Sequence, residues 1–421
     1  MTIYKDQAND TFQKLYEQWA VWKANDYNGY GGRFWHAGNT MHACVEYWNA
    51  VRNDESPPTQ DVMRIIADTY NYVNSELEKL DQYGIDASWM YDDFGWHANA
   101  FSRALQVGIP WGNAPTESEA MGVANRIWNF YTNTYCALNY ETSQGEQTHT
   151  FPGCYSSQDV QGGNNTVTNA LYMNFSNRLY SLDKNEMYLT AANKQYELFQ
   201  TWIDNQDLLK NGKEPSVPCG LIRWGVADFD WQTIGFPNYG KWVWIGNQGL
   251  VIAGLNGFSE TNRLMLGTSL TSYAFDHLFD EEKVLHEAPF EVIYGDIINP
   301  LPYPWSPSPN NTIQGDPYDY MMGRGVLLRF IGETRLLEGY AEYANQTADA
   351  AYKTIDNDNI GWNAGSQENF QKSFISMWGG EAKMGNFNND WASLPGNPFK
   401  VAQLTNILDA QVAAINLGDK Q

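Results

Sequence analysis

The sequence predicts an all-α protein, a toroid of paired helices formed by one domain over residues 1–421. Apolar residues recur at helical spacings of three and four through most of the chain, whereas strict strand alternation is scarce. Short connections alternate with long irregular ones rich in Gly, Pro and aromatic residues, at 140–165, 209–243 and 281–317. A ring of helix pairs has this rhythm, with short turns on one face and long loops that build a site on the other.

Two segments show the helical pattern most clearly. One stripe, at spacings of three and four, consists of Val62, Ile66, Tyr70, Val73, Leu77 and Leu80. The pattern is repeated by Val167, Leu171, Phe175, Leu179 and Leu182. Extended along the chain, the same pattern predicts about a dozen helices. In chain order they are 3–24, 35–52, 60–83, 92–109, 116–139, 166–183, 186–208, 244–258, 260–280, 318–333, 335–356, 366–379 and 400–416.

Two of these helices carry a start signal. Thr116 is followed by Glu119, and Asp183 is followed by Glu186, so that each pair resembles a capping box ahead of an apolar run. We therefore expect Thr116 and Asp183 to accept hydrogen bonds from free N–H groups in the first turn of a helix.

Composition and charge restrict the class of partner. The chain has 421 residues, of which 43% are hydrophobic, so it can bury a large core. Its formal net charge is −23, with 49 acidic against 26 basic side chains, and such a surface repels nucleic acid and anionic membranes. No stretch approaches the roughly 18 consecutive apolar residues of a membrane span. We expect a neutral or cationic partner, no nucleic acid and no membrane span.

The cysteines and sequons bear on the compartment. No C-x-x-C spacing occurs, which disfavours a zinc cluster, and the cysteines allow up to two disulfides or, equally well, buried free thiols. Asn-x-Ser/Thr sequons are a weak sign of the secretory route in a chain so rich in Asn. The first residues, MTIYKDQANDTF, lack the apolar core of a signal peptide. We expect a secreted or cell-surface protein whose signal peptide is not present in this chain. The four cysteines are Cys44, Cys136, Cys154 and Cys219.

Aromatic content is unusually high, at 15%, with 17 Trp and 26 Tyr. These side chains combine a flat apolar face with a polar tip, which suits stacking on the C–H faces of sugar rings. Most of them are equally explained as filling of a large core. The excess favours a carbohydrate ligand, with Trp89, Trp96, Trp231 and Trp244 as candidate stacking platforms.

The stretch YDDFGWHANAF, at 91–101, places two consecutive carboxylates among aromatic residues. Neighbouring residues diverge by about 100° on a helix, so Asp92 and Asp93 converge on one ligand only at a loop-to-helix junction. Helix capping explains such a pair about as well, but it does not require Trp89, Tyr91 and Trp96 nearby.

Glycoside hydrolysis gives the pair a chemical use. One carboxylic acid protonates the leaving oxygen and one carboxylate acts as nucleophile or base, at a separation of about 5–5.5 Å in retaining enzymes. Adjacent residues reach this separation more easily than the wider inverting one. An apolar surround and mutual repulsion favour the neutral form of one group while the other stays ionised.

Other catalytic patterns are missing from the sequence. The six histidines form no HExxH motif, and neither a Gly-x-Ser-x-Gly elbow nor a P-loop occurs. We expect no cofactor and no metal site. The stretch VADFDW offers Asp228 and Asp230 in a long loop, which suits a clamp on sugar hydroxyls or simply a solvated loop.

Several stretches, in the right order, resemble family 76 of the glycoside hydrolases, whose members include endo-α-1,6-mannanases with an (α/α)6 toroid fold. The resemblance covers most of the chain. YDDFGWHANAF is similar to the family's Asp-Asp-x-x-Trp-Trp catalytic motif. The other similar stretches are FWHAGNTMHACVEYWNAV, NNTVTNALYMNFSNRLYSLDKNEMYLTAA, WIGNQGLVIAGL and DYMMGRGVLLRFIG.

The resemblance implies a retaining endo-glycosidase that acts on an α-linked mannan, with α-1,6 as the expected linkage. It assigns Asp92 as nucleophile and Asp93 as general acid/base. No cofactor is implied, and the partner is a polysaccharide or oligosaccharide bound by a monomer.

The resemblance also marks polar positions on other helices. Asn169, Asn247, Gln248 and Asp319 match family-typical residues that face the central cleft, although satisfied hydrogen bonds between helices explain them equally well. Gly249 favours the cleft slightly, because a small residue beside two amides lets a substrate approach closely.

Departures from the family pattern concern the cleft wall. His97 stands at the family's second Trp, and Arg324 stands at its Lys position. We include both as candidate substrate-binding residues, with Tyr91 and Trp96. These changes leave the carboxylate chemistry intact and leave the sugar and linkage open.

Three rival functions remain. A transglycosylase on the same scaffold would act on cell-wall or GPI-linked mannan and favour a sugar acceptor over water. An endo-acting hydrolase of a different α-glycan would use the same pair, and a non-catalytic glycan-binding protein would not depend on it. A lyase of uronic acids would need a basic cleft, which the acidic chain disfavours.

Overall fold

A computed structural model describes residues 3–24, 34–83, 91–113, 115–135, 140–143, 148–151, 154, 166–209, 245–257, 261–279, 281–285, 317–334, 339–355 and 398–418. The predicted helix 366–379 lies outside these residues, as do the side chains of Trp89, Asp228, Asp230, Trp231 and Trp244.

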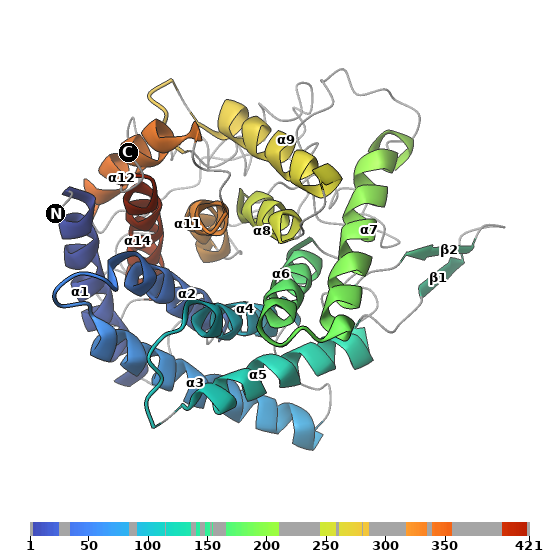
Figure 1. Cartoon of the computed structure of the whole chain (residues 1–421), viewed down its shortest axis with the longest axis horizontal. Coiled ribbons are helices and arrows are strands. Elements are labelled where there is room, and N and C mark those ends of the chain that lie inside the picture. Colours follow the sequence, from blue (N-terminus) through green and yellow to red (C-terminus); the bar gives the residue numbers. More distant parts are fainter. Residues whose placement is uncertain are drawn as a thin grey trace, which may run out of the picture.

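A closed ring of helices forms the centre of the molecule (Figure 1). Each ring helix packs against the next in chain order, and the last packs against the first, so that the ring closes. The ring helices are α2 (Phe34–Val51), α4 (Tyr91–Val107), α6 (Thr166–Asp183), α8 (Ile245–Asn256), α11 (Pro317–Gly332) and α14 (Pro398–Gly418).

A second set of helices surrounds the ring, each packed against a ring helix. Its members are α1 (Ile3–Ala24), α3 (Thr59–Tyr83), α5 (Glu117–Phe130), α7 (Glu186–Leu209), α9 (Thr261–Leu278) and α12 (Ala341–Tyr352). Inner and outer helices alternate along the described chain, which is the (α/α)6 toroid. The predicted all-α fold is therefore confirmed. Within the described residues, no helix is long and apolar enough to cross a membrane.

Amphipathic sequences explain why the outer helices lie where they do. Of the predicted stripe on α3, Val62, Ile66, Val73 and Leu77 are at most 1% exposed and Leu80 is 6% exposed, whereas Tyr70 is partly exposed. Fully burying one such side chain contributes about 1.5–3 kcal/mol to folding. Every predicted helix that falls on described residues is present, with its ends shifted by a few residues.

Three local details differ from the predictions or refine them. The capping box of Thr116 and Glu119 is confirmed at the start of α5. The capping box expected at Asp183 is wrong, because Asp183 is the last residue of α6. Its carboxylate accepts a hydrogen bond from Asn185 N–H. Asn185 Oδ1 in turn accepts one from Met187 N–H, at the start of α7. The irregular segment 140–165 contains an antiparallel hairpin of β1 (Tyr140–Ser143) and β2 (Thr148–Phe151).

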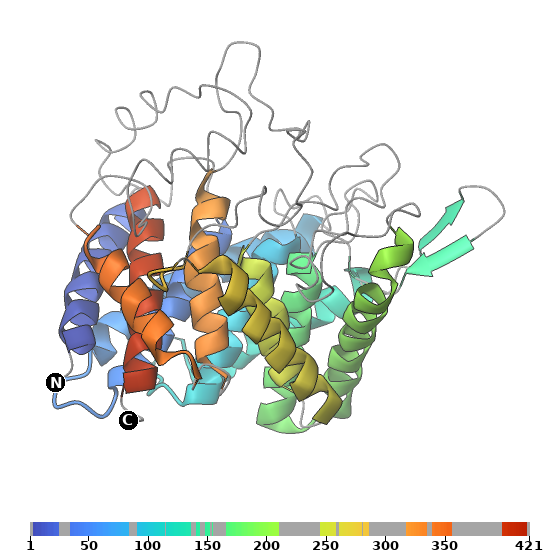
Figure 2. The ribbon, with the colours of Figure 1, turned by 90° about the horizontal axis from the view of Figure 1, so that it is seen from above.

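The inner helices run in the same direction. Asn174 Nδ2 of α6 donates to the carbonyl of Leu250 in α8 at 2.7 Å, and Asn177 Nδ2, one turn later, donates to that of Gly254 at 3.0 Å. The contacts advance together along both helices, which requires parallel axes. Figure 2 shows α1 beginning and α14 ending at the same end of the ring. The inner helices therefore all begin at the opposite end.

Parallel neighbours approach closely at a glycine. A Cβ atom on Gly249 of α8 would lie 2.6 Å from Leu327 Cα and 3.0 Å from its carbonyl oxygen in α11. Both contacts are with backbone, which cannot swing aside. Gly249 therefore sets the distance between these two inner helices, and this packing role differs from the substrate-approach role considered from the sequence.

Two buried histidines join α2 to its neighbours. His97 Nε2 of α4 lies 3.0 Å from the Phe34 carbonyl oxygen, and His42 Nε2 of α2 lies 2.9 Å from Glu333 Oε1. Both rings are fully buried. Burial lowers the pKa of His97 to about 3, although the Phe34 carbonyl acts to raise it. Burial also lowers the pKa of His42 to about 3, against the opposing effect of Glu333. Both imidazoles are neutral in the folded protein.

The cysteines take both of the forms considered from the sequence. Cys154 is disulfide-bonded, and Cys44 of α2 is a buried free thiol. Four cysteines with one of them free leave room for a single disulfide, so the possibility of two is wrong. Burial raises the pKa of the Cys44 thiol above its ordinary value, which keeps this thiol unreactive.

Substituting Gly249 tests the close approach of α8 and α11. We expect Gly249→Ala to lower the free energy of unfolding by about 1–3 kcal/mol, because the added methyl group meets backbone. Gly122→Ala on α5 is the matched control, since nothing lies within 4 Å of its Cβ position. There, alanine stabilises the helix by about 0.5–1 kcal/mol. Equal effects of the two changes in urea unfolding would contradict this account.

The buried histidines predict a loss of stability in acid. Below pH 6.5 the unfolded chain takes up protons on His42 and His97, whereas the folded chain does not until about pH 3. Stability therefore falls as the pH decreases through this window, and each histidine contributes about 1.4 kcal/mol per pH unit. We expect His97→Phe to reduce the slope of unfolding free energy between pH 6 and pH 4 by about that amount.

Urea titrations at several pH values measure this slope. Phe101→Leu, a truncation in the buried part of α4 that keeps both histidines, controls for the loss of stability itself. An unchanged slope in His97→Phe would mean that His97 does not bind its proton differently in the folded and unfolded chains.

Candidate active site

Asp92 and Asp93 lie in the first turn of α4, at the end of the ring where the inner helices begin. The predicted junction is therefore present, because α4 starts at Tyr91. Asp92 is partly exposed, whereas Asp93 is only 8% exposed. The two neighbouring carboxyl groups thus occupy different environments, which is how proteins assign acid and base roles to a pair.

The charge of this pair affects the pKa values of two tyrosines. Burial raises the pKa of Tyr131 well above its ordinary value, and the charges of Asp92 and Asp93 add to the effect. Burial likewise raises the pKa of Tyr72 on α3, with further contributions from Glu76 and Asp93. Both phenols therefore stay protonated beside the carboxylates and are able to donate hydrogen bonds.

The ring brings several predicted residues to the same end. Asn169 lies in the first turn of α6, Asn247 and Gln248 lie in the first turn of α8, and Asp319 lies in the first turn of α11. Only the backbone of Asp319 is described. Because the helices are parallel, their positive dipole ends also converge here, and they favour ionised carboxylates in the first turns.

The amides have different surroundings. Asn169 binds the backbone of Cys154, accepting from its N–H at 2.7 Å and donating to its carbonyl at 3.0 Å. This pair of bonds attaches the disulfide-bonded Cys154 to the inner ring. Asn247 is fully buried and Gln248 is 4% exposed. The Nε2 group of Gln248 has no hydrogen-bond partner within the described structure.

The aromatic and basic candidates are deeply placed. Tyr91 is 5% exposed and Trp96 is 2% exposed, with the Trp96 ring 5.3 Å from that of Trp35. His97 is fully buried, with its ring 4.2 Å from that of Phe34. That environment gives His97 a packing role between α2 and α4, in place of a substrate contact. Arg324 is also fully buried, in the second turn of α11.

Three residues near the pair did not emerge from the sequence. Tyr72 belongs to the outer helix α3 and Tyr131 to the π-helical turn Tyr131–Tyr135 that follows α5, and the distance from Asp93 in the chain hides their proximity. Trp35, in the first turn of α2, is partly exposed and lies against Trp96. Its place in FWHAGN, a stretch of the family resemblance, was the only available signal.

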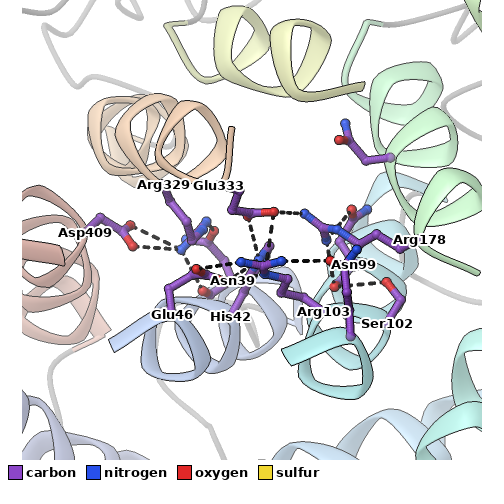
Figure 3. Close-up of polar contacts among 12 residues, drawn as sticks. Asn39, His42, Glu46, Asn99, Ser102, Arg103, Arg178, Arg329, Glu333 and Asp409 are labelled. Atoms are coloured by element: carbon purple, nitrogen blue, oxygen red, sulfur yellow. Dashed lines mark hydrogen bonds and ion pairs between the residues drawn. The ribbon is translucent and has the colours of Figure 1, made fainter. Parts of the chain in front are cut away.

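A buried network of charges spans the ring away from this end (Figure 3). Arg178 of α6 pairs with Glu333 and donates to Asn99 Oδ1 at 3.0 Å. Arg103 of α4 pairs with Glu46 of α2. Arg329 completes the network, with Nη1 lying 3.1 Å from Asp409 Oδ2 and 3.0 Å from the Asn39 carbonyl.

The network balances three arginines against three carboxyl groups, and it is mostly buried, with Arg103 and Glu333 partly exposed. Burial acts to raise the pKa of Glu333, but the charges of Arg178 and Arg103 and the hydrogen bond with His42 outweigh it and hold that pKa below its ordinary value. Ligand atoms of His42, Glu46 and Glu333 lie within 4.8 Å of one another, a spacing that a metal ion also accepts. Because arginines already pair with both carboxylates, the positive charge that a cation would bring is supplied by the protein. The network suits a structural role.

Comparison with known proteins gives matches in structure alone. No protein-family model matches the chain, and no curated protein matches it. The chain resembles the Lin0763 protein from Listeria innocua, with 14% identity, a TM-score of 0.61, and coverage of 100% of this chain and 99% of that chain. It also resembles Dfg5 from Chaetomium thermophilum, solved with glucosamine, with 14% identity, a TM-score of 0.60, and coverage of 97% and 90%.

A third similar structure is an inactive variant of the α-1,6-mannanase GH76A of Salegentibacter sp. HEL1_6, in complex with α-1,6-mannotriose. Its identity is 12% and its TM-score is 0.60, and the match covers 98% of this chain and 99% of that chain. In that variant, two consecutive aspartates are replaced by asparagine. The structural likeness confirms the resemblance seen in the sequence at the level of the fold, which is the fold of family 76 glycoside hydrolases.

Proposed function

We propose that the chain is a retaining endo-glycosidase that hydrolyses an α-linked mannan at α-1,6-mannosidic bonds. The observation that carries the proposal is the pair Asp92 and Asp93 in the first turn of an inner helix. It is the only Asp-Asp sequence in the chain. In the similar mannanase, the inactive variant bound to mannotriose also has two consecutive aspartates changed.

The environments of the two carboxyl groups suit the two roles of a double displacement. Asp92, partly exposed at a positive helix end, is the nucleophile that attacks the anomeric carbon and forms a glycosyl-enzyme. Asp93, more deeply buried, is the acid that protonates the departing oxygen. It then takes a proton from water, which attacks the anomeric carbon and releases Asp92.

Other features are compatible with a neutral polysaccharide outside the cell. The net charge of −23 does not oppose an uncharged sugar. The disulfide at Cys154 favours an oxidising compartment, and hence secretion or the cell surface. We further propose a single catalytic domain that acts as a monomer, with Trp35 added to Trp96 as an aromatic surface at the site.

The direct test is release of reducing ends from unbranched α-1,6-mannan. We expect Asp92→Asn and Asp93→Asn each to lower kcat by about 10²–10⁴-fold or more, because each change removes a group that reacts or transfers a proton. Asp61→Asn is the matched control, since Asp61 also lies in the first turn of a helix, α3, away from the site. That change should leave kcat at the wild-type value.

Calorimetric binding of α-1,6-mannotriose separates loss of chemistry from loss of folding. Both site variants should still bind the trisaccharide, and their thermal unfolding midpoints should stay close to that of the wild type. Wild-type activity in Asp92→Asn would sink the proposed mechanism. Binding of the trisaccharide without any cleavage by the wild type would favour a non-catalytic glycan-binding protein.

Transfer of the glycosyl group to a sugar acceptor is the second candidate, because it uses the same carboxylate pair. The same glycosyl-enzyme would then react with a sugar hydroxyl in place of water. Mass spectrometry of products formed with a labelled mannobiose acceptor distinguishes the two outcomes. A labelled product longer than the acceptor indicates transfer, and unlabelled short oligosaccharides alone indicate hydrolysis.

A further inference from the structure

Tyr131 connects an outer helix to the turn that carries the carboxylate pair. It follows Phe130, the last residue of α5, and begins a π-helical turn, Tyr131–Tyr135. Such turns are rare and are frequent at functional sites. The side chain of Tyr131 is fully buried and contacts both α4 and α6 of the inner ring.

The Tyr131 hydroxyl lies against one step of the hydrogen-bond ladder of α4. It donates to the carbonyl oxygen of Tyr91 and accepts from the N–H of Gly95. In a regular helix, the N–H of residue 95 and the carbonyl of residue 91 bond directly to each other. A side chain that inserts at such a step changes the local direction of the helix. The step spans Asp92 and Asp93.

The sequence of α4 makes room for this hydroxyl. A Cβ atom on Gly95 would lie 2.5 Å from the Tyr131 oxygen and 3.1 Å from Leu171 Cδ1. The first contact is shorter than any ordinary van der Waals distance, so a side chain at position 95 would displace the hydroxyl. Only glycine at this position of the YDDFGW stretch leaves space for the Tyr131 hydroxyl.

Packing fixes the ring that carries the hydroxyl. The ring centroids of Tyr172 and Phe175, both on α6, each lie 5.3 Å from that of Tyr131, one tilted at 31° and the other edge-on at 89°. Aromatic contacts from two directions hold the phenol in one orientation. The position of the α4 turn is thus tied to α5 and α6 through one side chain.

We propose that Tyr131 is a positioning residue: its hydroxyl sets the geometry of the turn 91–95 and thereby aims the side chains of Asp92 and Asp93. The catalytic part of this inference rests on the proposed function. If the hydroxyl were purely structural, its removal would lower the stability of the protein and leave kcat for mannan cleavage unchanged. The two roles predict different kinetic results.

Tyr131→Phe removes the hydroxyl and keeps the ring. We expect kcat on α-1,6-mannan to fall by about 10–100-fold, because small displacements of reacting groups have effects of this size, while KM changes little. Tyr172→Phe is the matched control. It removes a hydroxyl from the same aromatic cluster, but that hydroxyl lies 2.7 Å from Thr132 Oγ1 and makes no bond to α4 in the described structure. Its kcat should match the wild type.

Hydrogen–deuterium exchange of the peptide that covers 91–95 gives a readout that needs no substrate. This peptide should exchange faster in Tyr131→Phe than in the wild type or Tyr172→Phe, because the hydroxyl that interacts with Gly95 N–H and the Tyr91 carbonyl is gone. If the wild type cleaves mannan and Tyr131→Phe has the same kcat, the inference is wrong. If the wild type cleaves nothing, the proposed function fails, and equal exchange in the three proteins would overturn the inference independently.

Discussion

Parallel packing of the inner helices is the constraint on which the other features depend. Parallel neighbours must approach each other closely. The amide of Asn174 reaches the backbone carbonyl of Leu250 in the next inner helix, and Gly249 lets the backbone of Leu327 come near. The inner helices must also compensate the charged groups that the ring buries. The network around Arg178 and Glu333 meets this requirement with paired charges, which together remain close to neutral. Removing one member would leave a buried charge uncompensated.

The same constraint gives the ring two unlike ends. Where the inner helices begin, free N–H groups and dipole ends converge, and acidic or amide side chains occupy the first turns of α4, α8 and α11. Farther along the helices, Arg103, Arg178 and Arg329 neutralise the buried carboxylates. Carboxylates near the first end therefore remain available for chemistry, whereas those of the network are committed to structure.

Sequence reasoning predicted the helices because the buried face of a helix repeats every three or four residues, and apolar residues such as Val62 and Ile66 show this repeat in the sequence. It also located Asp92 and Asp93, since a charged pair among aromatic residues needs a reason. It missed Tyr131, because a π-helical turn continues the helical periodicity of 116–139 without a visible break. It placed His97 at the substrate, whereas its complete burial beside Phe34 depends on how α2 meets α4. Contacts between distant segments carry no local signal in one sequence.

The central claim is that a carboxylate, and not water, first attacks the anomeric carbon. Proton NMR of the anomeric region during digestion of unbranched α-1,6-mannan tests it most directly, before mutarotation mixes the anomers. The account predicts that new reducing ends appear first in the α configuration, because two displacements restore the original one. Reducing ends that appear first in the β configuration would show a single displacement by water, and would contradict the assignment of Asp92 as nucleophile.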